Sequence, residues 1–301
     1  MRKVILALVP CMAGSVYFFG WRALAVIAVS CLTAFTVEYL MCRKRGEPVT
    51  EAVFVTGILF GLVLPPTVPW HVVIFGAAFA IMFSKEVFGG FGRNFFNPAL
   101  AGRCFVYICF AQSMTTQWAN PAPLPWGGLS MWSTYTVDSI TAATPMIGMK
   151  LNAVVPPLSD LFFGHISGVL GGTSALLILL GGIYLFWKKI ASRETILSVI
   201  ITYAILNEGL FRLGVSEFHG ALPALLGGGF LLGAFFMATD PVSSPKTREG
   251  RIIYGIIIAG CTAIIRNYSI FNGGMMFAIL LGNMFAPIID YGINAYKKKK
   301  A

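Results

Sequence analysis

The residues of this chain best suited to covalent chemistry lie in a short, hydroxyl-rich stretch that ends in a proline, Asp138-Ser-Ile-Thr-Ala-Ala-Thr-Pro145. Ala142 and Ala143 leave the hydroxyl of Thr144 sterically open, and Pro145 restricts Thr144 to extended backbone geometry. Such a hydroxyl could accept a covalent modification. It could equally be an ordinary capping or turn residue, and the residue pattern alone leaves both interpretations open.

Two ionisable residues are further candidates because they stand within or beside apolar sequence. Asp240 follows an apolar run and precedes Pro241, which predicts a position at a broken helix end, either as a functional group or as a cap. Arg103 lies inside an apolar run and needs an anionic or carbonyl partner. Glu86 and a lipid phosphate are candidates for that partner.

Neither the histidines nor the cysteines have the spacing of metal ligands. The histidines, His71, His165 and His219, are far apart in sequence, and the six cysteines include no Cys-x-x-Cys pair. Most of the cysteines lie in apolar stretches, as is typical of small residues that face a core or lipid. We therefore expect no metal site.

The composition indicates which elements must position these residues. Of the 301 residues, 57% are hydrophobic and 11% are charged, whereas soluble domains carry about 45–50% and about 25%. The mean hydropathy is +0.78. The chain is therefore expected to be an all-α integral membrane protein. The same figures exclude a disordered chain, a nucleic-acid-binding protein and a secreted disulfide scaffold.

Long uncharged runs predict about ten membrane-spanning helices. The run from Ala52 to Ser84 holds two of them, provided that the prolines near Pro65 make a turn. The apolar N-terminus is expected to be a retained first helix rather than a cleaved signal. The other expected spans are Val4–Phe19, Ala23–Met41, Pro98–Phe110, Ile166–Trp187, Thr195–Leu206, Ala221–Ala238, Ile252–Ile265 and Gly273–Ile289.

The basic residues predict the side of the membrane that each loop faces. Of the 22 lysines and arginines, 17 fall at the termini and in alternate loops, and four fall in the intervening loops. Because basic residues accumulate on the cytoplasmic side, both termini are expected in the cytoplasm. The first group is Arg2, Lys3, Arg43, Lys44, Arg45, Lys85, Arg93, Lys188, Lys189, Arg193, Lys246, Arg248, Arg251 and Lys297–Lys300. The outer group is Arg22, Lys150, Arg212 and Arg266.

The two halves of the chain carry similar landmarks. In each half a Gly-xxx-Gly pair precedes a proline turn, and an Arg-Asn pair follows at about the same distance. Arg93 lies 36 residues after Gly57, and Arg266 lies 37 residues after Gly229. Since the predicted topology puts the two arginines on opposite sides, we expect two inverted five-helix repeats, as in many transporters.

The segment between the repeats is too long to be a simple connection. A loop of more than about 12–15 residues usually carries a function or is disordered, and residues 112–165 are too rich in aromatic residues for disorder. We therefore expect three units. These are a first repeat over residues 1–111, an outer loop over residues 112–165 and a second repeat over residues 166–301.

The stretch Asp138–Thr144 resembles the flavin-transferase acceptor motif, Asp-Gly-x-Ser/Thr-Gly-Ala-Thr, in which the last threonine carries FMN through a phosphoester bond. Ser139 and Ala142 stand where that motif has glycines. The matching positions are Asp138, Thr141, Ala143 and Thr144.

Three further segments are similar to landmarks of one family, RnfD/NqrB, the flavin-carrying membrane subunits of ion-translocating electron-transfer complexes. They are Gly89–Ala99, Met237–Pro245 and Phe271–Asn283. The resemblance covers nearly the whole chain, from about Ala52 to Tyr291. The short N-terminus favours the Rnf (RnfD) branch of the family over the quinone-reductase (NqrB) branch, whose members have a longer N-terminal extension.

The resemblance implies a function as well as a fold. The chain would be a membrane subunit of an ion-translocating ferredoxin:NAD+ oxidoreductase in the cytoplasmic (inner) membrane. It would carry electrons on FMN bound covalently to Thr144 in the outer loop and couple their transfer to Na+ or H+ transport. A non-covalent riboflavin is a second candidate cofactor, and Asp240 and Arg103 are candidate contacts for an ion or a flavin. The implied partners are Rnf subunits A, B, C, E and G, a flavin transferase and membrane lipid, but no nucleic acid.

Two other functions are compatible with the same architecture. A cofactor-free channel or transporter could use the same inverted repeat, but it would not need the stretch around Thr144. A purely structural membrane scaffold would tolerate a Thr144→Ala substitution without loss of electron transfer. No catalytic side chain is expected in the flavin-carrying subunit, because the flavin supplies the redox chemistry and the protein supplies position and electrostatics.

Overall fold

A computed structural model describes residues 1–123, 125–133, 146, 148–149, 155–215, 220–269, 271 and 273–300, and the backbone of residues 140–141. Nearly all regular structure in this part of the chain is helical, in agreement with the predicted all-α class. The longer helices are α1 (Arg2–Phe19), α2 (Trp21–Arg45), α3 (Ala52–Leu62), α4 (Trp70–Ile81), α5 (Pro98–Cys109), α9 (Ala175–Trp187), α10 (Arg193–Arg212), α13 (Arg248–Tyr268) and α14 (Met275–Lys300).

Short elements complete the described structure. Two π-helical turns, η1 (Met82–Glu86) and η4 (Gly233–Met237), continue α4 and the three-residue helix α12 (Phe230–Leu232). Single π-helical turns within helices frequently occur at functional sites. The others are α6 (Ala111–Thr115), β1 (Trp118–Ala119), the 3-10 helix η2 (Gly127–Ser130), β2 (Ile140–Thr141), α8 (Leu158–Phe163) and α11 (Ala221–Leu226).

Several helices have the length and composition of membrane spans. Four of them, α1, α2, α10 and α14, are long and apolar enough to cross a bilayer, and α3, α5 and α9 are apolar but shorter. A span of the hydrocarbon core needs about 20 apolar residues. The described helices therefore fit a protein that crosses the membrane several times.

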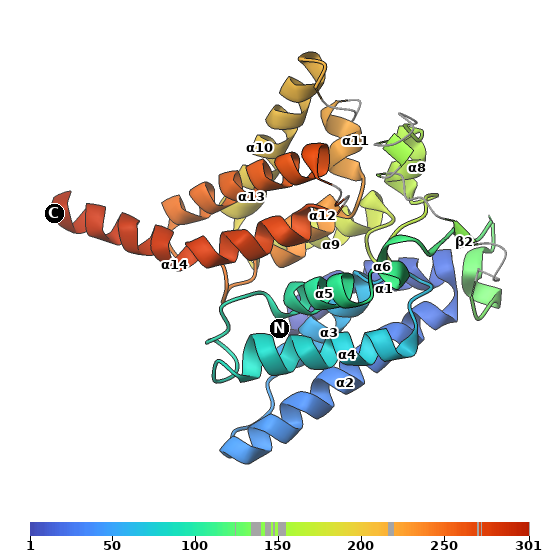
Figure 1. Cartoon of the computed structure of the whole chain (residues 1–301), viewed down its shortest axis with the longest axis horizontal. Helices are drawn as coiled ribbons and strands as arrows, with labels where there is room; N and C mark the ends of the chain where they lie inside the picture. Colours follow the sequence, from blue (N-terminus) through green and yellow to red (C-terminus); the bar gives the residue numbers. More distant parts are fainter. Residues whose placement is uncertain are drawn as a thin grey trace.

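The two halves of the chain pack their helices in a similar order. In the first half α2 packs on α3 and α4, and α4 packs on α5. In the second half α10 packs on α11 and α13, and α13 packs on α14. In Figure 1 the first-half helices, blue to green, lie on one side of the molecule and the second-half helices, yellow to red, lie on the other.

Helices α1 and α9 join the two halves through a close backbone contact. A Cβ atom at Gly181 of α9 would lie 2.0 Å from the carbonyl oxygen of Ala7 in α1. Any larger residue at this position would push the two helices apart. Small residues at such crossings allow the dense helix packing that membrane proteins rely on.

Part of the connecting segment is folded against one end of the helices. Strands β1 and β2 pair antiparallel, with Trp118 opposite Thr141, and β2 and α8 lie at the same end of the molecule in Figure 1. The amides of Trp21 and Arg22 donate to the carbonyls of Met131 and Trp132 at 3.2 and 2.7 Å. The first turn of α2 is thereby satisfied by the connecting segment.

Two predicted spans differ from the observed helices. The span expected over Ile166–Trp187 is helical only from Ala175, because the preceding chain runs against the end of α3. The amides of Leu170 and Gly171 donate to the carbonyls of Leu64 and Leu62 at 3.0 and 2.7 Å. These bonds satisfy carbonyls that the end of a helix leaves free.

The span expected over Ala221–Ala238 is interrupted after α11. Gly228 and Gly229 have φ angles of 63° and 65°. This left-handed conformation is sterically free for glycine, whereas a Cβ atom makes it unfavourable for other residues. The helix therefore breaks into α11 and α12.

Three basic residues that the sequence predicts in loops are instead buried at helix ends. Arg22, Lys85 and Arg266 are 9%, 2% and 0% exposed. Arg22 donates to the carbonyls of Pro66 and Val68, in the turn between α3 and α4. The loop prediction is wrong for these residues. In the sequence a charged residue that interrupts an apolar run marks the end of a predicted span, even where the fold buries its charge.

Candidate functional site

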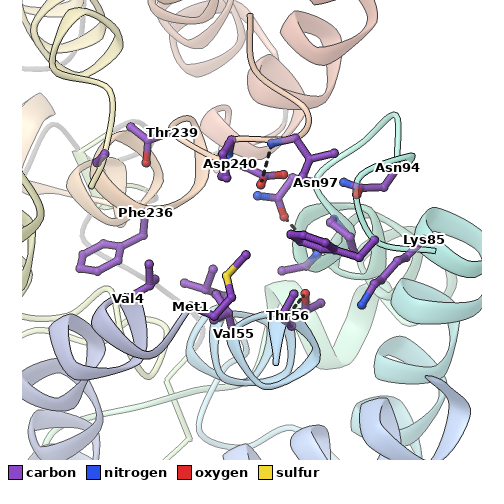
Figure 2. A pocket seen from close by; sticks show the side chains of 18 of the residues that line it. Met1, Val4, Val55, Thr56, Lys85, Asn94, Asn97, Phe236, Thr239 and Asp240 are labelled. Carbon is purple, nitrogen blue, oxygen red and sulfur yellow. Dashed lines mark hydrogen bonds between the residues drawn. The ribbon is translucent and has the colours of Figure 1, made fainter. Parts of the chain in front are cut away.

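Two cavities between the halves contain the polar groups of greatest functional interest. The larger, which we call the Asp240 cavity, has a volume of about 190 Å³. Helices α1, α3 and α9, the segment before α5 and the chain around η4 line it. In Figure 2 Asp240 and Asn97 lie on one side of this cavity, and Met1, Val55 and Thr56 lie on the other.

Asp240 itself closes a turn at the end of η4. Its carboxylate accepts hydrogen bonds from the hydroxyl of Ser243 at 2.7 Å and the amide of Val242 at 3.4 Å. No ion pair joins Asp240 to another residue in the described part of the chain. The carboxylate therefore caps a turn, which is one of the two roles expected from the sequence, and Asp240 also lines the cavity.

Asn97 joins the two halves beside this cavity. Its side-chain oxygen accepts hydrogen bonds from the amides of Ala99 and Leu100 at 3.1 and 3.3 Å, which caps the start of α5. Its side-chain nitrogen donates to the carbonyl of Met237 in η4 at 3.2 Å. Asn97 is only 4% exposed, so this inter-half hydrogen bond is shielded from solvent.

The smaller cavity, which we call the Arg103 cavity, has a volume of about 70 Å³. Its wall contains Arg103 and Tyr107 from α5 and Trp118 from β1, with Gly228 and Gly229 at the break before α12. Residues on its wall therefore come from both halves and from the connecting segment.

Arg103 has no partner that matches its charge. Its Nε atom is buried without a hydrogen-bond partner in the described part of the chain. The expected pairing with Glu86 is wrong, because Glu86 pairs with Arg45. The sequence showed that Arg103 needed a partner but not that Arg45 would pair with Glu86.

Arg266 is a buried cation that the sequence analysis placed on the surface. Its Nη1 donates to the hydroxyl of Tyr203 and to the carbonyl of Ala224, both at 2.9 Å. Its Nη2 donates to the carbonyls of Gly227 and Gly228 at 3.5 and 3.3 Å. Arg266 therefore holds the broken helix beside the Arg103 cavity.

A second buried charge network lies at the end of α2. Lys85 donates to Glu38 at 2.5 Å and to the hydroxyl of Thr50 at 2.9 Å. Glu38, Cys42 and Glu86 are close enough together to hold a metal ion. Lys85 and Arg45 neutralise the two carboxylates, however, so this network is already balanced in charge.

Most of the predicted flavin motif lies outside the described residues. This applies to Asp138, Ala143 and Thr144, whereas Thr141 is described by its backbone alone. Thr141 pairs with Trp118, whose side chain lines the Arg103 cavity. Of the predicted candidates, Arg103 and Asp240 are both described, and they line different cavities.

These features define a class of protein: a helical membrane protein of several spans, with polar groups buried between two similarly packed halves. The chain matches the model of the NQR2, RnfD, RnfE family over residues 1–299, and it therefore belongs to this family. The predicted family is thereby confirmed.

Relatives of known name are similar over almost the whole chain. The D subunit of an ion-translocating oxidoreductase complex from Stutzerimonas stutzeri is 35% identical, over 99% of this chain and 93% of its own. The D subunit of a Na(+)-translocating ferredoxin:NAD(+) oxidoreductase complex from Acetobacterium woodii is 36% identical, over 99% and 92%. The B subunit of a Na(+)-translocating NADH-quinone reductase from Pseudoalteromonas atlantica is 38% identical, over 89% of this chain but 66% of its own.

Proposed function

We propose that this chain is the D subunit of an ion-translocating ferredoxin:NAD+ oxidoreductase complex in the cytoplasmic membrane. The observation that carries this proposal is the similarity to D subunits over 99% of the chain. The chain would pass electrons by way of FMN attached to Thr144 and couple their transfer to Na+ or H+ movement. Its partners would be subunits A, B, C, E and G, membrane lipid and the flavin transferase that matures it.

The residues around the acceptor threonine support this proposal. Asp138, Thr141, Ala143 and Thr144 match the acceptor motif. Attachment would replace the hydroxyl proton of Thr144 with the phosphorus of FMN. The transferase would supply FMN as an activated phosphoanhydride, whose other half leaves with the bonding electron pair.

The residues of the Arg103 cavity can be compared with the chemical requirements of FMN. A buried guanidinium with an unpartnered Nε atom suits an anion, and FMN brings one as its phosphate. When bound, the flavin supplies one- and two-electron transfer, while the protein supplies position and electrostatics. The chemistry of this cavity therefore fits the cofactor that the motif implies.

We assign the Asp240 cavity to the second candidate cofactor, riboflavin. Its wall combines apolar side chains such as Val4 and Phe236 with the carboxylate of Asp240. A neutral flavin offers N–H and hydroxyl donors from which this carboxylate could accept hydrogen bonds. Since cofactor pockets usually measure about 300–1,000 Å³, we expect the side chain of Met1 to move aside when a ring system enters.

We further propose that the chain crosses the membrane ten times as two inverted repeats, with both termini in the cytoplasm and the flavin loop outside. The similar packing order of the two halves supports this arrangement. So do two buried cations at comparable positions, Lys85 and Arg266. Lys85 contacts Glu38 in α2 and Thr50, two positions before α3. Arg266 contacts Tyr203 in α10 and Gly228, two positions before α12.

The test of the proposed function is covalent flavin on the full-length chain. The chain is produced with its flavin transferase and separated on a denaturing gel, and the band is examined under ultraviolet light. We expect a fluorescent band and an FMN-sized mass on the peptide that contains Thr144. Thr144→Val should abolish both signals, and the matched variant Thr116→Val, at an exposed threonine outside the motif, should retain them.

Two outcomes would contradict the proposal. A bare Thr144 in chain isolated from its native host would favour a cofactor-free channel or transporter of the same architecture. If the wild-type chain is flavinylated but the complex transfers electrons equally well with Thr144→Val, the chain would instead be a structural scaffold.

A further inference from the structure

A third cavity, separate from those assigned to the candidate cofactors, lies where two connecting loops meet. The first loop joins α9 to α10 over residues 188–192, and the second leads from η4 to α13 over residues 238–247. These loops and the first turns of α10 and α13 line a cavity of about 430 Å³, which we call the loop cavity. Its volume is within the roughly 300–1,000 Å³ of pockets that hold small ligands.

The wall of the loop cavity carries a net positive charge. Among its described residues are four basic side chains and a single acidic one, which are Lys189, Arg193, Lys246, Arg251 and Glu194. The carboxylate of Glu194 is already shared between Arg251 and Arg248, each at 3.6 Å. Lys189 and Lys246 form no ion pair within the described ranges of the chain. The cavity is therefore suited to an anionic ligand.

Contacts elsewhere in the fold hold the basic residues in position. Arg193 donates from Nε to the carbonyl of Phe186 at 2.9 Å and from Nη2 to the carbonyl of Trp187 at 3.2 Å. Asp290, which does not line the cavity, accepts from the amide of Lys246 at 2.7 Å and so anchors the second loop. Because these positions are set before a ligand arrives, less ordering is required when it binds.

Lys189 adopts a backbone conformation that is unfavourable for lysine. Its φ angle of 56° is the one left-handed value at a non-glycine residue in the ranges that the structure describes. Its amide donates to the carbonyl of Phe186 at 3.3 Å at the end of α9, a position that glycine usually occupies. Strained residues of this kind are concentrated at functional sites. A glycine would avoid the strain, so the strain points to a role for the ammonium group.

The helices that end at the loop cavity expose apolar faces. Trp187, the last residue of α9, is 79% exposed, and tryptophan is enriched where lipid meets water. Exposed apolar residues continue along α9 as Ile183 and Leu180, and along α10 as Leu197 and Ile201. Each series recurs every three or four residues and therefore follows one face of its helix. In a membrane-spanning chain this places the loop cavity at the level of the lipid headgroups.

We propose that the loop cavity binds the headgroup of an anionic phospholipid. The phosphate oxygens accept hydrogen bonds from the ammonium groups of Lys189 and Lys246 and from the guanidinium group of Arg193. The acyl chains lie along the exposed apolar faces of α9 and α10. Basic pockets between membrane-spanning helices are a general means of recognising anionic headgroups. This assignment requires that the chain lies in a membrane, but it does not require the proposed flavin, so either proposal can fail without the other.

The test is lipid binding to the full-length chain in detergent, measured by native mass spectrometry. Phosphatidylglycerol or phosphatidylcholine is titrated into wild type, Lys189→Gly, Lys246→Gln and the double variant. We expect wild type to bind the anionic phosphatidylglycerol more tightly than the zwitterionic phosphatidylcholine. Each single variant should weaken phosphatidylglycerol binding about fivefold and the double variant about 25-fold, since each basic residue contributes roughly that factor at an anionic surface.

Two comparisons separate a ligand-binding role from a structural one. Lys189→Gly removes the charge and also relieves the left-handed backbone, so without lipid it should melt at about the same temperature as wild type or higher. Lys188→Gln removes a charge from the same loop at an exposed residue outside the cavity wall, and it should bind phosphatidylglycerol like wild type. A photoactivatable phosphatidylglycerol in nanodiscs should label the loop around Lys189 in wild type and far less in the double variant.

Three results would overturn the proposal. Equal affinity of wild type for the two lipids would mean that the headgroup charge is not recognised. Equal phosphatidylglycerol affinity of wild type and the double variant would place lipid binding elsewhere, for example at the basic tail Lys297–Lys300. If inorganic phosphate or pyrophosphate binds lipid-free wild type, competes with phosphatidylglycerol and is lost in the double variant, the ligand is a soluble phosphate rather than a lipid.

Discussion

The ammonium group of Lys85 lies 2.5 Å from a carboxylate oxygen of Glu38, and the two side chains are 2% and 0% exposed. The hydroxyl of Thr50 completes the contact by donating to Glu38 at 2.7 Å and accepting from Lys85 at 2.9 Å. This pair joins η1, which continues α4, to the second half of α2, and both side chains are shielded from solvent. Its geometry allows a direct measurement of what a buried charge contributes to this fold.

Removing one partner of this pair should destabilise the protein strongly. In Glu38→Gln the ammonium of Lys85 is left buried without its counter-charge, which typically costs about 3–5 kcal/mol. We expect a much lower apparent melting temperature and yield. The matched control, Glu208→Gln, breaks a pair with Arg212 that is largely exposed and should have little effect. The double variant Glu38→Leu/Lys85→Met should recover most of the loss, and a failure to recover would contradict this account.

The hydroxyl of Tyr203 should contribute to holding the broken helix. Tyr203→Phe removes one hydrogen-bond partner of Arg266 while keeping the ring that stacks at 4.1 Å on Phe230. Loss of a partner by a buried charged donor costs about 1–3 kcal/mol. Thermal unfolding in detergent measures the change. Tyr268→Phe, at a residue 65% exposed, is the control, and equal stability of the two variants would count against a role for this hydroxyl.

The contact between α1 and α9 should not tolerate a side chain at Gly181. Gly181→Ala places a methyl group 2.0 Å from the carbonyl oxygen of Ala7, so the helices must separate, at a cost of about 1–3 kcal/mol. Gly260→Ala in α13 meets no atom within 4 Å, and it should be neutral or slightly stabilising because alanine favours helix. The apparent melting temperatures of the two variants decide the point, since similar values would mean that the close approach is unimportant.

The predicted topology can be tested by labelling single cysteines. In a background without native cysteines, Trp132→Cys, at a residue 60% exposed, should react with an impermeant maleimide in right-side-out vesicles. Lys299→Cys, in the basic tail, should react only after permeabilisation. If both cysteines were labelled from the same side, the chain between residues 132 and 299 would cross the membrane an even number of times. The expected position of the connecting segment outside would then be wrong.

The sequence by itself determined the class of this protein and its family. Composition alone required a membrane protein, because 57% hydrophobic residues cannot all be buried inside a soluble domain. Local patterns also identified Arg103 and Asp240 as residues whose charge needs an explanation. These conclusions depend on residue type and spacing, which folding does not change.

Only the tertiary structure decided which charges are buried and what balances them. Arg22, Lys85 and Arg266 look like loop residues in sequence, yet their partners are carbonyls, a hydroxyl and a carboxylate from distant parts of the chain. The break before α12 likewise depends on the left-handed glycines and on the contacts of Arg266. The physical reason is that a charge in an apolar protein is stabilised by groups brought near it in space, and those groups are distant along the chain.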